Sequence, residues 1–203
     1  LKGLLEESTK ELGIDSMNLP KLSKLTDEEL LEKLHTVDDE RSFQVYEAIK
    51  RDGDKFAGAC FTSGSAGTMS SGDYLKDHYP TLKLGVGEAL QCPTILNNGF
   101  GGHRIEGIGD KHIPFIHNVK NTDMAIAIDD EDSQRLLRLF NTEDGKAYLI
   151  NDLGLDKEFV EKLSWLGISG IANILCCIKM AKYYEFTEHD VIATVLTDSA
   201  DMY

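Results

Sequence analysis

The 203-residue sequence has few basic residues and no long apolar run. It carries 21 lysines and arginines against 35 aspartates and glutamates, which gives a formal net charge of −14. A nucleic-acid partner requires basic side chains that displace the counterions of the phosphate backbone, so this balance argues against one. It argues in the same way against an anionic membrane surface. No apolar run approaches the length of a transmembrane helix. We therefore expect neither a nucleic-acid nor a membrane partner.

Cysteine is also scarce. The four cysteines lie within or beside apolar stretches, at positions Cys60, Cys92, Cys176 and Cys177. Their spacing fits neither a zinc site nor a disulfide framework. Buried free thiols are typical of proteins in a reducing compartment. We expect a cytoplasmic protein without a bound metal.

Apolar strand-like runs alternate with amphipathic helical stretches from residue 56 onward. Expected strands cover residues 56–61, 83–86, 124–128 and 191–196, and expected helices cover 69–78, 130–140, 157–163 and 171–184. This alternation predicts an α/β fold with a mainly parallel, twisted sheet and helices on both faces.

A polar segment rich in lysine, glutamate and leucine precedes the α/β region. A capping box at Thr26–Glu29 predicts a helix through about residue 35, and a second helix is expected over 41–51. We therefore divide the chain into an N-terminal helical extension or insertion, residues 1–40, and an α/β domain, residues 41–203.

The first α/β connection, TSGSAGT at 62–68, consists of small residues. Small side chains let the backbone approach an anion, and the free N–H groups at a helix start attract a phosphate. The run has no lysine, so it is not a P-loop, and the chain lacks the dinucleotide fingerprint of a nicotinamide dehydrogenase. From these residues alone, a phosphate site and an ordinary glycine-rich turn are equally good interpretations.

A second polar run follows the last expected strand, at residues 197–199. Ligands of parallel sheets bind at the carboxyl ends of the strands. The runs at 62–68 and 197–199 both occupy such ends, so they could face one crevice.

Several further motifs, in order, resemble the fold-type II pyridoxal-phosphate enzymes, the family of cysteine synthase and the tryptophan synthase β-subunit. GSAGT at 64–68 is similar to the family's GTGGT-like loop, and IEGIGDKHIP at 105–114 resembles its loop at the active-site mouth. The acidic DDED at 129–132, GISGIAN at 167–173 and TDSADMY at 197–203 are similar to its acidic helix start, its GISSGAN run and its PDSGERY ending. The match covers residues 42–203, and the runs at 88–93 and 98–104 look like a separate branch of the family.

This resemblance implies a pyridoxal 5'-phosphate cofactor and a set of residues that bind it. The phosphate ligands would be Gly64, Ser65, Ala66, Gly67 and Thr68. A hydroxyl beside the pyridine nitrogen would come from Thr197, which we prefer, or from Ser169 after a one-residue shift of the alignment. Such a hydroxyl supports a neutral pyridine ring. No catalytic residue is assigned.

The sequence departs from the family in one respect that bears on activity. The lysine that binds the cofactor covalently lies upstream of the phosphate loop in the family, in an S-x-K-x-R-like context, and no such motif occurs here. Both ends of the chain look cut, so the sequence resembles the C-terminal part of such an enzyme. Without the lysine, this part alone should be inactive.

The expected function is that of the C-terminal part of a pyridoxal-phosphate-dependent lyase or transferase. Its partner would be a small amino-acid substrate, and a homodimer is the assembly to test. The alternative is a non-catalytic α/β module that binds another phosphate ligand or serves as a partner subunit. The absent lysine favours this alternative, whereas the ordered motifs favour the enzyme.

Overall fold

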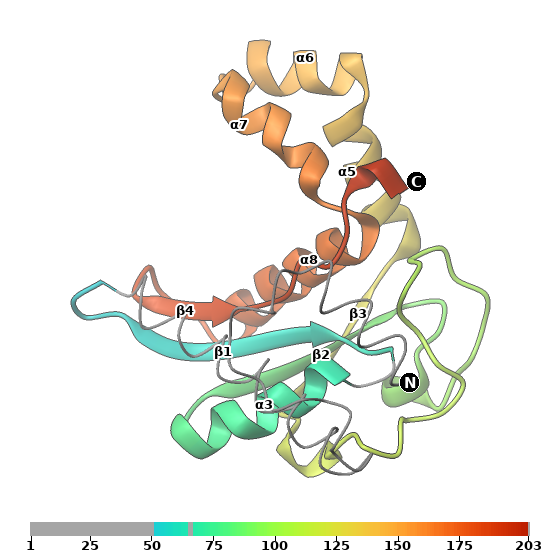
Figure 1. Cartoon of the computed structure of the whole chain (residues 1–203), viewed down its shortest axis with the longest axis vertical. Helices are drawn as coiled ribbons and strands as arrows, with labels where there is room; N and C mark the ends of the chain where they lie inside the picture. Colours follow the sequence, from blue (N-terminus) through green and yellow to red (C-terminus); the bar gives the residue numbers. More distant parts are fainter. Residues whose placement is uncertain (1–50, 65–66, 203) are drawn as a thin grey trace, which may run out of the picture.

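In the computed structural model, which describes residues 51–64 and 67–202, four parallel strands form one sheet in the order β3-β2-β1-β4 (Figure 1). The strands are β1 (Lys55–Thr62), β2 (Lys83–Ala89), β3 (Met124–Ile128) and β4 (Asp190–Ala193). The predicted parallel α/β fold is confirmed. The expected extension at 1–40 and helix at 26–35 lie outside the described residues, as does nearly all of the helix expected at 41–51.

Helices connect the strands. They are α3 (Gly67–His78), α4 (Thr94–Asn97), α5 (Asp130–Asn141), α6 (Glu143–Asn151), α7 (Lys157–Lys162) and α8 (Ile168–Tyr183). Short 3-10 turns are η3 (Val119–Asn121), η4 (Leu163–Trp165) and η5 (Ala200–Met202). In Figure 1, α6 and α7 extend beyond the sheet at the top of the view.

The two longest connecting helices that touch the sheet cover opposite faces of it. Side chains alternate along β1, so Cys60 packs with α8 residues in one buried cluster, whereas Ala59 and Phe61 pack with α3 residues in another. Figure 1 shows α3 and α8 on the two sides of the strands. The prediction of helices on both faces is therefore confirmed.

Two glycines of β2 allow α8 to lie close to the sheet. A Cβ atom at Gly85 would stand 2.5 Å from the Met180 Cε, and one at Gly87 would stand 2.5 Å from the Cys176 Sγ. Both distances are too short for real contacts. The end of the Met180 side chain could turn aside, but the short Cys176 side chain could not, so a side chain at Gly87 would push the helix outward. The close approach also brings the start of α8 to the carboxyl edge of the sheet.

Most element bounds differ from the predictions by one to three residues, and not every helix was predicted. The strand expected at 191–196 ends at Ala193, because the Thr194 hydroxyl, rather than a backbone N–H, donates to the Cys60 carbonyl (2.6 Å). The helix expected from 171 begins at Ile168. Helix α6 was not predicted: its apolar residues are consecutive rather than periodic, and the Thr142 side chain caps its start.

Within the described residues, no single helix is long and apolar enough to cross a membrane. Residues 157–165 and 168–183 reach that length and composition only as a pair that bends by 111° between them.

We predict that Gly87→Ala destabilises the chain by about 1–3 kcal/mol, because the new methyl group meets a short side chain on a packed helix. Gly102→Ala is the matched control, since a Cβ there meets nothing within 4 Å. Urea unfolding followed by circular dichroism measures both. Adding Cys176→Ala should restore part of the loss, and equal stabilities of the two glycine variants would contradict this account.

Candidate active site

The candidate phosphate loop begins where β1 ends. The Ser63 N–H donates to the Gly87 carbonyl (2.7 Å), and the Ser63 carbonyl accepts from the Gly109 N–H (2.7 Å). The chain then enters α3, a twelve-residue helix with no acidic residue in its first turn. Of the five predicted phosphate ligands, Gly64 lies just after β1 and Gly67 and Thr68 begin α3, while Ser65 and Ala66 lie outside the described residues. The strand–loop–helix layout suits an anion, since free N–H groups and the helix dipole lie at its centre.

A buried asparagine on α8 joins the phosphate loop to the segment after β4. The Asn173 side chain is 3% exposed; its Oδ1 accepts from the Thr62 N–H (2.8 Å) and its Nδ2 donates to the Val195 carbonyl (2.8 Å). One amide therefore fixes the ends of two strands relative to the start of α8. The same side chain therefore holds the start of the polar run at 62–68 and the residue two positions before the run at 197–199.

The two alternative hydroxyls, from Ser169 and Thr197, lie against each other. Their oxygens are 3.0 Å apart, and the Ser169 hydroxyl also donates to the Asp198 carboxylate (3.0 Å). Ser169 is 6% exposed, whereas Thr197 is exposed at the surface of the site. The Asp198 carbonyl accepts from the Gly167 N–H (3.0 Å), so this segment also caps α8. Sequence reasoning treated the two hydroxyls as alternatives and missed that they form one group with Asp198.

The loop that resembles the active-site mouth packs beside the phosphate loop. A Cβ atom at Gly64 would stand 3.0 Å from the Gly107 carbonyl oxygen. Gly107 and Gly109 adopt positive φ angles of 79° and 85°, which side chains rarely tolerate. A small cavity of about 10 Å³ lies between Ser63 and this loop, with Glu88 and Asp110 in its lining.

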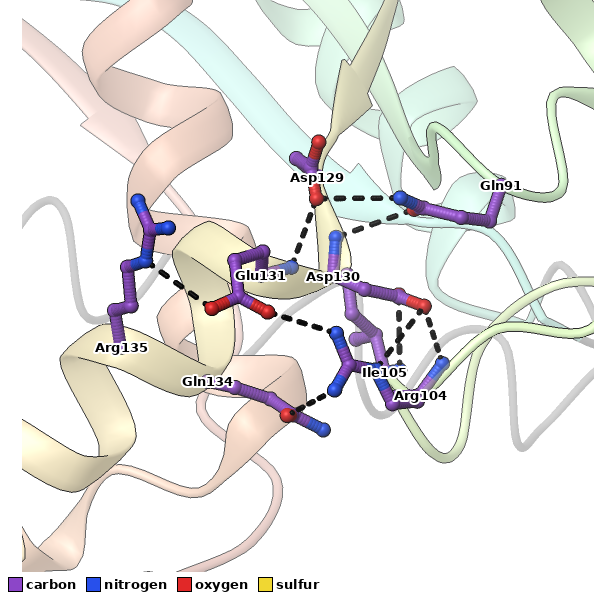
Figure 2. Close-up of polar contacts among 8 residues, drawn as sticks. All are labelled: Gln91, Arg104, Ile105, Asp129, Asp130, Glu131, Gln134 and Arg135. Carbon is purple, nitrogen blue, oxygen red and sulfur yellow. Dashed lines mark hydrogen bonds and ion pairs between the residues drawn. The ribbon is translucent and has the colours of Figure 1, made fainter.

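Buried carboxylates hold the long connection that carries this loop. Glu88, 2% exposed at the end of β2, accepts from the Ile95 N–H (2.9 Å) and the Leu96 N–H (2.8 Å). Asp130, 3% exposed at the start of α5, accepts from the Arg104 N–H (2.7 Å) and the Ile105 N–H (3.3 Å), as Figure 2 shows. The acidic run at 129–132 is therefore more than a helix start with favourable charge.

Exposed polar and charged side chains around Asp130 bind one another (Figure 2). The Arg104 guanidinium donates to Glu131 (3.0 Å) and Gln134 (2.8 Å), and Arg135 donates to Glu131 (3.2 Å). The hydrogen bond from Arg104 holds the pKa of Glu131 below its usual value. The Glu131 N–H similarly lowers the pKa of Asp129, whose carboxylate caps α5.

We compared the sequence with those of known proteins. No family model matches the chain. It is 29% identical to cysteine synthase B of Campylobacter jejuni over 141 residues, which are 69% of this chain and 40% of that protein. It is also 29% identical to a probable cysteine synthase of Bacillus subtilis over 103 residues, 50% of this chain and 33% of that protein.

Solved structures of related enzymes share the fold of this chain. A hydrogen sulfide-producing enzyme of Fusobacterium nucleatum superimposes with a TM-score of 0.66, over 97% of this chain and 53% of that one, at 21% identity. The O-acetylserine-dependent cystathionine β-synthase of Helicobacter pylori gives a TM-score of 0.58 over 80% of this chain and 45% of that one, at 26% identity.

The chain resembles the cysteine synthases in sequence and in fold. The resemblance predicted from its motifs is thereby confirmed. The chain spans about half, or less, of the length of the proteins it matches. Among its described residues, no group of three or more histidine, cysteine, aspartate or glutamate side chains could hold a metal ion.

We predict that Asn173→Leu costs about 2–5 kcal/mol, because the buried Thr62 N–H and Val195 carbonyl both lose their partner. The control is Asn141→Leu on the outer part of α5, where the amide makes one exposed hydrogen bond to Leu137. That variant should stay within about 0.5 kcal/mol of the wild type. Urea unfolding measures the stability of both variants. Similar losses of stability in the two would show that the Asn173 bridge is unimportant.

We predict a similar contrast between two neighbouring acids. Asp130→Ala should cost about 2–3 kcal/mol, since two backbone N–H groups lose their acceptor. Glu131→Gln, which breaks only exposed pairs, should cost much less than Asp130→Ala.

The stability loss caused by Glu131→Gln should depend on pH. The lowered pKa of Glu131 stabilises the fold fully above the usual carboxyl pKa of about 4.3, and the effect fades as the pH falls through the folded-state pKa. Urea unfolding of the wild type and Glu131→Gln at neutral and acidic pH should therefore converge on acidification. A constant difference would mean that the ion pairs contribute nothing.

Proposed function

We propose that this chain holds the phosphate of pyridoxal 5'-phosphate between β1 and α3. The complete protein would be a lyase or transferase that acts on a small amino acid. The observation that carries the proposal is the Asn173 bridge, which brings a phosphate-type loop and a pair of hydroxyls to one edge of the sheet. These donors suit a ligand with an anionic group at one end and a ring nitrogen at the other.

Each part of the site has a distinct task in this proposal. Backbone N–H groups of residues 64–68 bind the phosphate, and Thr197 meets the ring. The loop at 105–109, held by Asp130 beside Gly64, covers the phosphate end and limits the entry of water. When bound, the cofactor supplies an electron sink that makes bonds at the substrate α-carbon labile.

Three of the described lysines are engaged elsewhere or lie far from the site. Lys76 pairs with Asp123 at 2.6 Å, and the Lys179 ammonium donates to the Ala127 carbonyl at 2.6 Å. Lys55 begins β1, at the amino edge of the sheet, opposite the site. We therefore propose that the 203-residue chain alone does not turn over amino acids, and that a lysine in another part of the complete protein anchors the cofactor.

The proposal is tested with pyridoxamine 5'-phosphate, which cannot form a Schiff base with lysine and so reports non-covalent binding alone. We predict that the chain binds it at least about tenfold more tightly than pyridoxamine, a difference of about 1.4 kcal/mol that the phosphate supplies. Gly67→Glu, which puts a negative charge at the start of α3, should abolish that difference. Titration calorimetry measures both ligands.

Gly102→Glu is the matched control, because it adds the same charge at an open position. It should leave the preference for the phosphorylated ligand unchanged. Equal binding of the two ligands to the wild type, or a preference that survives Gly67→Glu, would contradict the phosphate site. Equal competition by inorganic phosphate would favour the non-catalytic phosphate-binding module instead.

Borohydride reduction in the presence of pyridoxal 5'-phosphate tests the missing anchor. Peptide mapping should find no single dominant modified lysine. One dominant site, together with α-keto acid release from serine, would mean that the chain is catalytic by itself.

A further inference from the structure

A cavity of about 390 Å³ lies among α5, the start of α8 and the 3-10 turn η5. No described residue of the phosphate loop lines it. Ile168 lines it and directly precedes Ser169, and Asp201 lines it a few residues after Thr197. Its volume is in the range of pockets that bind small molecules. A ligand in this cavity would therefore lie next to the segment that carries Thr197.

Helix α5 supplies hydrogen-bond donors to the cavity. Gln134 and Arg138 are one turn apart on α5 and both line it. The Gln134 Oε1 accepts from Arg104 (2.8 Å), which leaves the Gln134 Nε2 as a donor for a ligand (Figure 2). In the part of the chain that the structure describes, no side chain or carbonyl accepts from the Arg138 guanidinium. An unpaired guanidinium beside an oriented amide N–H suits a carboxylate.

Two carboxylates from other elements line the same cavity. Glu106 lies in the loop at 105–109, and Asp201 lies in η5. Both side chains are exposed, and within residues 51–64 and 67–202 no donor binds either of them. The Arg104 charge does not offset them, because its guanidinium already donates to Glu131 (3.0 Å). Two unpaired carboxylates attract an ammonium group.

Leu137 and Ile168 add apolar surface to the lining. A guanidinium for a carboxylate, carboxylates for an ammonium and apolar surface for a side chain together match an α-amino acid in its zwitterionic form. A phosphate ester would be repelled by the two carboxylates. A purely apolar ligand would leave the charges around it without partners.

We propose that this cavity binds a free neutral amino acid, with its carboxylate at Gln134 and Arg138 and its ammonium at Glu106 and Asp201. Two unpaired carboxylates stand against one unpaired guanidinium, so a second negative charge on the ligand is unfavourable. The cavity therefore selects against aspartate and glutamate, and its apolar surface favours a side chain such as that of leucine. The site uses no group of the phosphate loop, so it does not rest on the proposed function.

Titration calorimetry with L-leucine, on the full 203-residue chain without cofactor, tests the proposal. Leucinamide lacks the carboxylate and N-acetyl-leucine lacks the ammonium, so each removes one of the two charges. We expect leucine to bind at least about tenfold more tightly than either analogue and than glutamate. No binding of leucine at millimolar concentration would overturn the proposal, as would an analogue or glutamate that binds as tightly as leucine.

Variants then assign the charges to residues. Arg138→Gln should weaken leucine binding by about tenfold and remove most of the preference for leucine over leucinamide. Asp201→Asn should instead reduce the preference for leucine over N-acetyl-leucine. Arg135→Gln is the matched control on the same helix, because Arg135 donates to Glu131 (3.2 Å) and is not part of the lining. If Arg135→Gln weakens leucine binding as much as Arg138→Gln does, the proposal is wrong.

The same titrations separate this site from the candidate cofactor site. Arg138→Gln should leave the binding of pyridoxamine 5'-phosphate unchanged. A chain that binds leucine but not pyridoxamine 5'-phosphate supports the amino-acid site and contradicts the proposed function. A chain that binds pyridoxamine 5'-phosphate but not leucine overturns the amino-acid site alone.

Discussion

The candidate site depends on one side-chain amide, that of Asn173. The Thr62 N–H needs an acceptor and the Val195 carbonyl needs a donor, and this amide supplies both at the two ends of one planar group. Aspartate lacks the donor, and an apolar side chain of similar size lacks both. Because Asn173 lies on a long helix packed against β1, β2 and β3, the bridge ties the end of β1 and the segment after β4 firmly to α8. The glycines of β2 contribute by allowing α8 to approach.

Two buried carboxylates fix the backbone of the long connection after β2, as Asn173 fixes the strand ends. Glu88 and Asp130 each accept two backbone N–H groups from residues that belong to neither helix nor strand, or to a single helical turn. Both stand at a carboxyl end, Glu88 within β2 and Asp130 just after β3. A buried carboxylate with several N–H partners is well solvated by the protein, so the loop gains order without an apolar core of its own.

Much of the fold could be predicted from local patterns. The strand at 124–128 matched β3 residue for residue, because a short apolar run bounded by polar residues leaves few alternatives. The end of β4 could not be predicted, since Val195 is a good strand residue by itself. Its carbonyl accepts from an asparagine 22 residues earlier, a long-range contact that no local pattern predicts. Helix α6 has no apolar periodicity, and its formation depends on the Thr142 cap and on packing beside α5 and α7.

The site was predictable in its parts but not in its connections. The phosphate loop follows from small residues between a strand and a helix, a strictly local signal. Ser169 and Thr197 are 28 residues apart, so the sequence offers them only as competing candidates. The structure places their oxygens 3.0 Å apart, with the Asp198 carboxylate bonded to Ser169. A hydroxyl considered alone can donate or accept, and its role is set by the ligand. The Ser169 hydroxyl donates its proton to a carboxylate that neither alternative included, so its role is set by the protein rather than by a ligand.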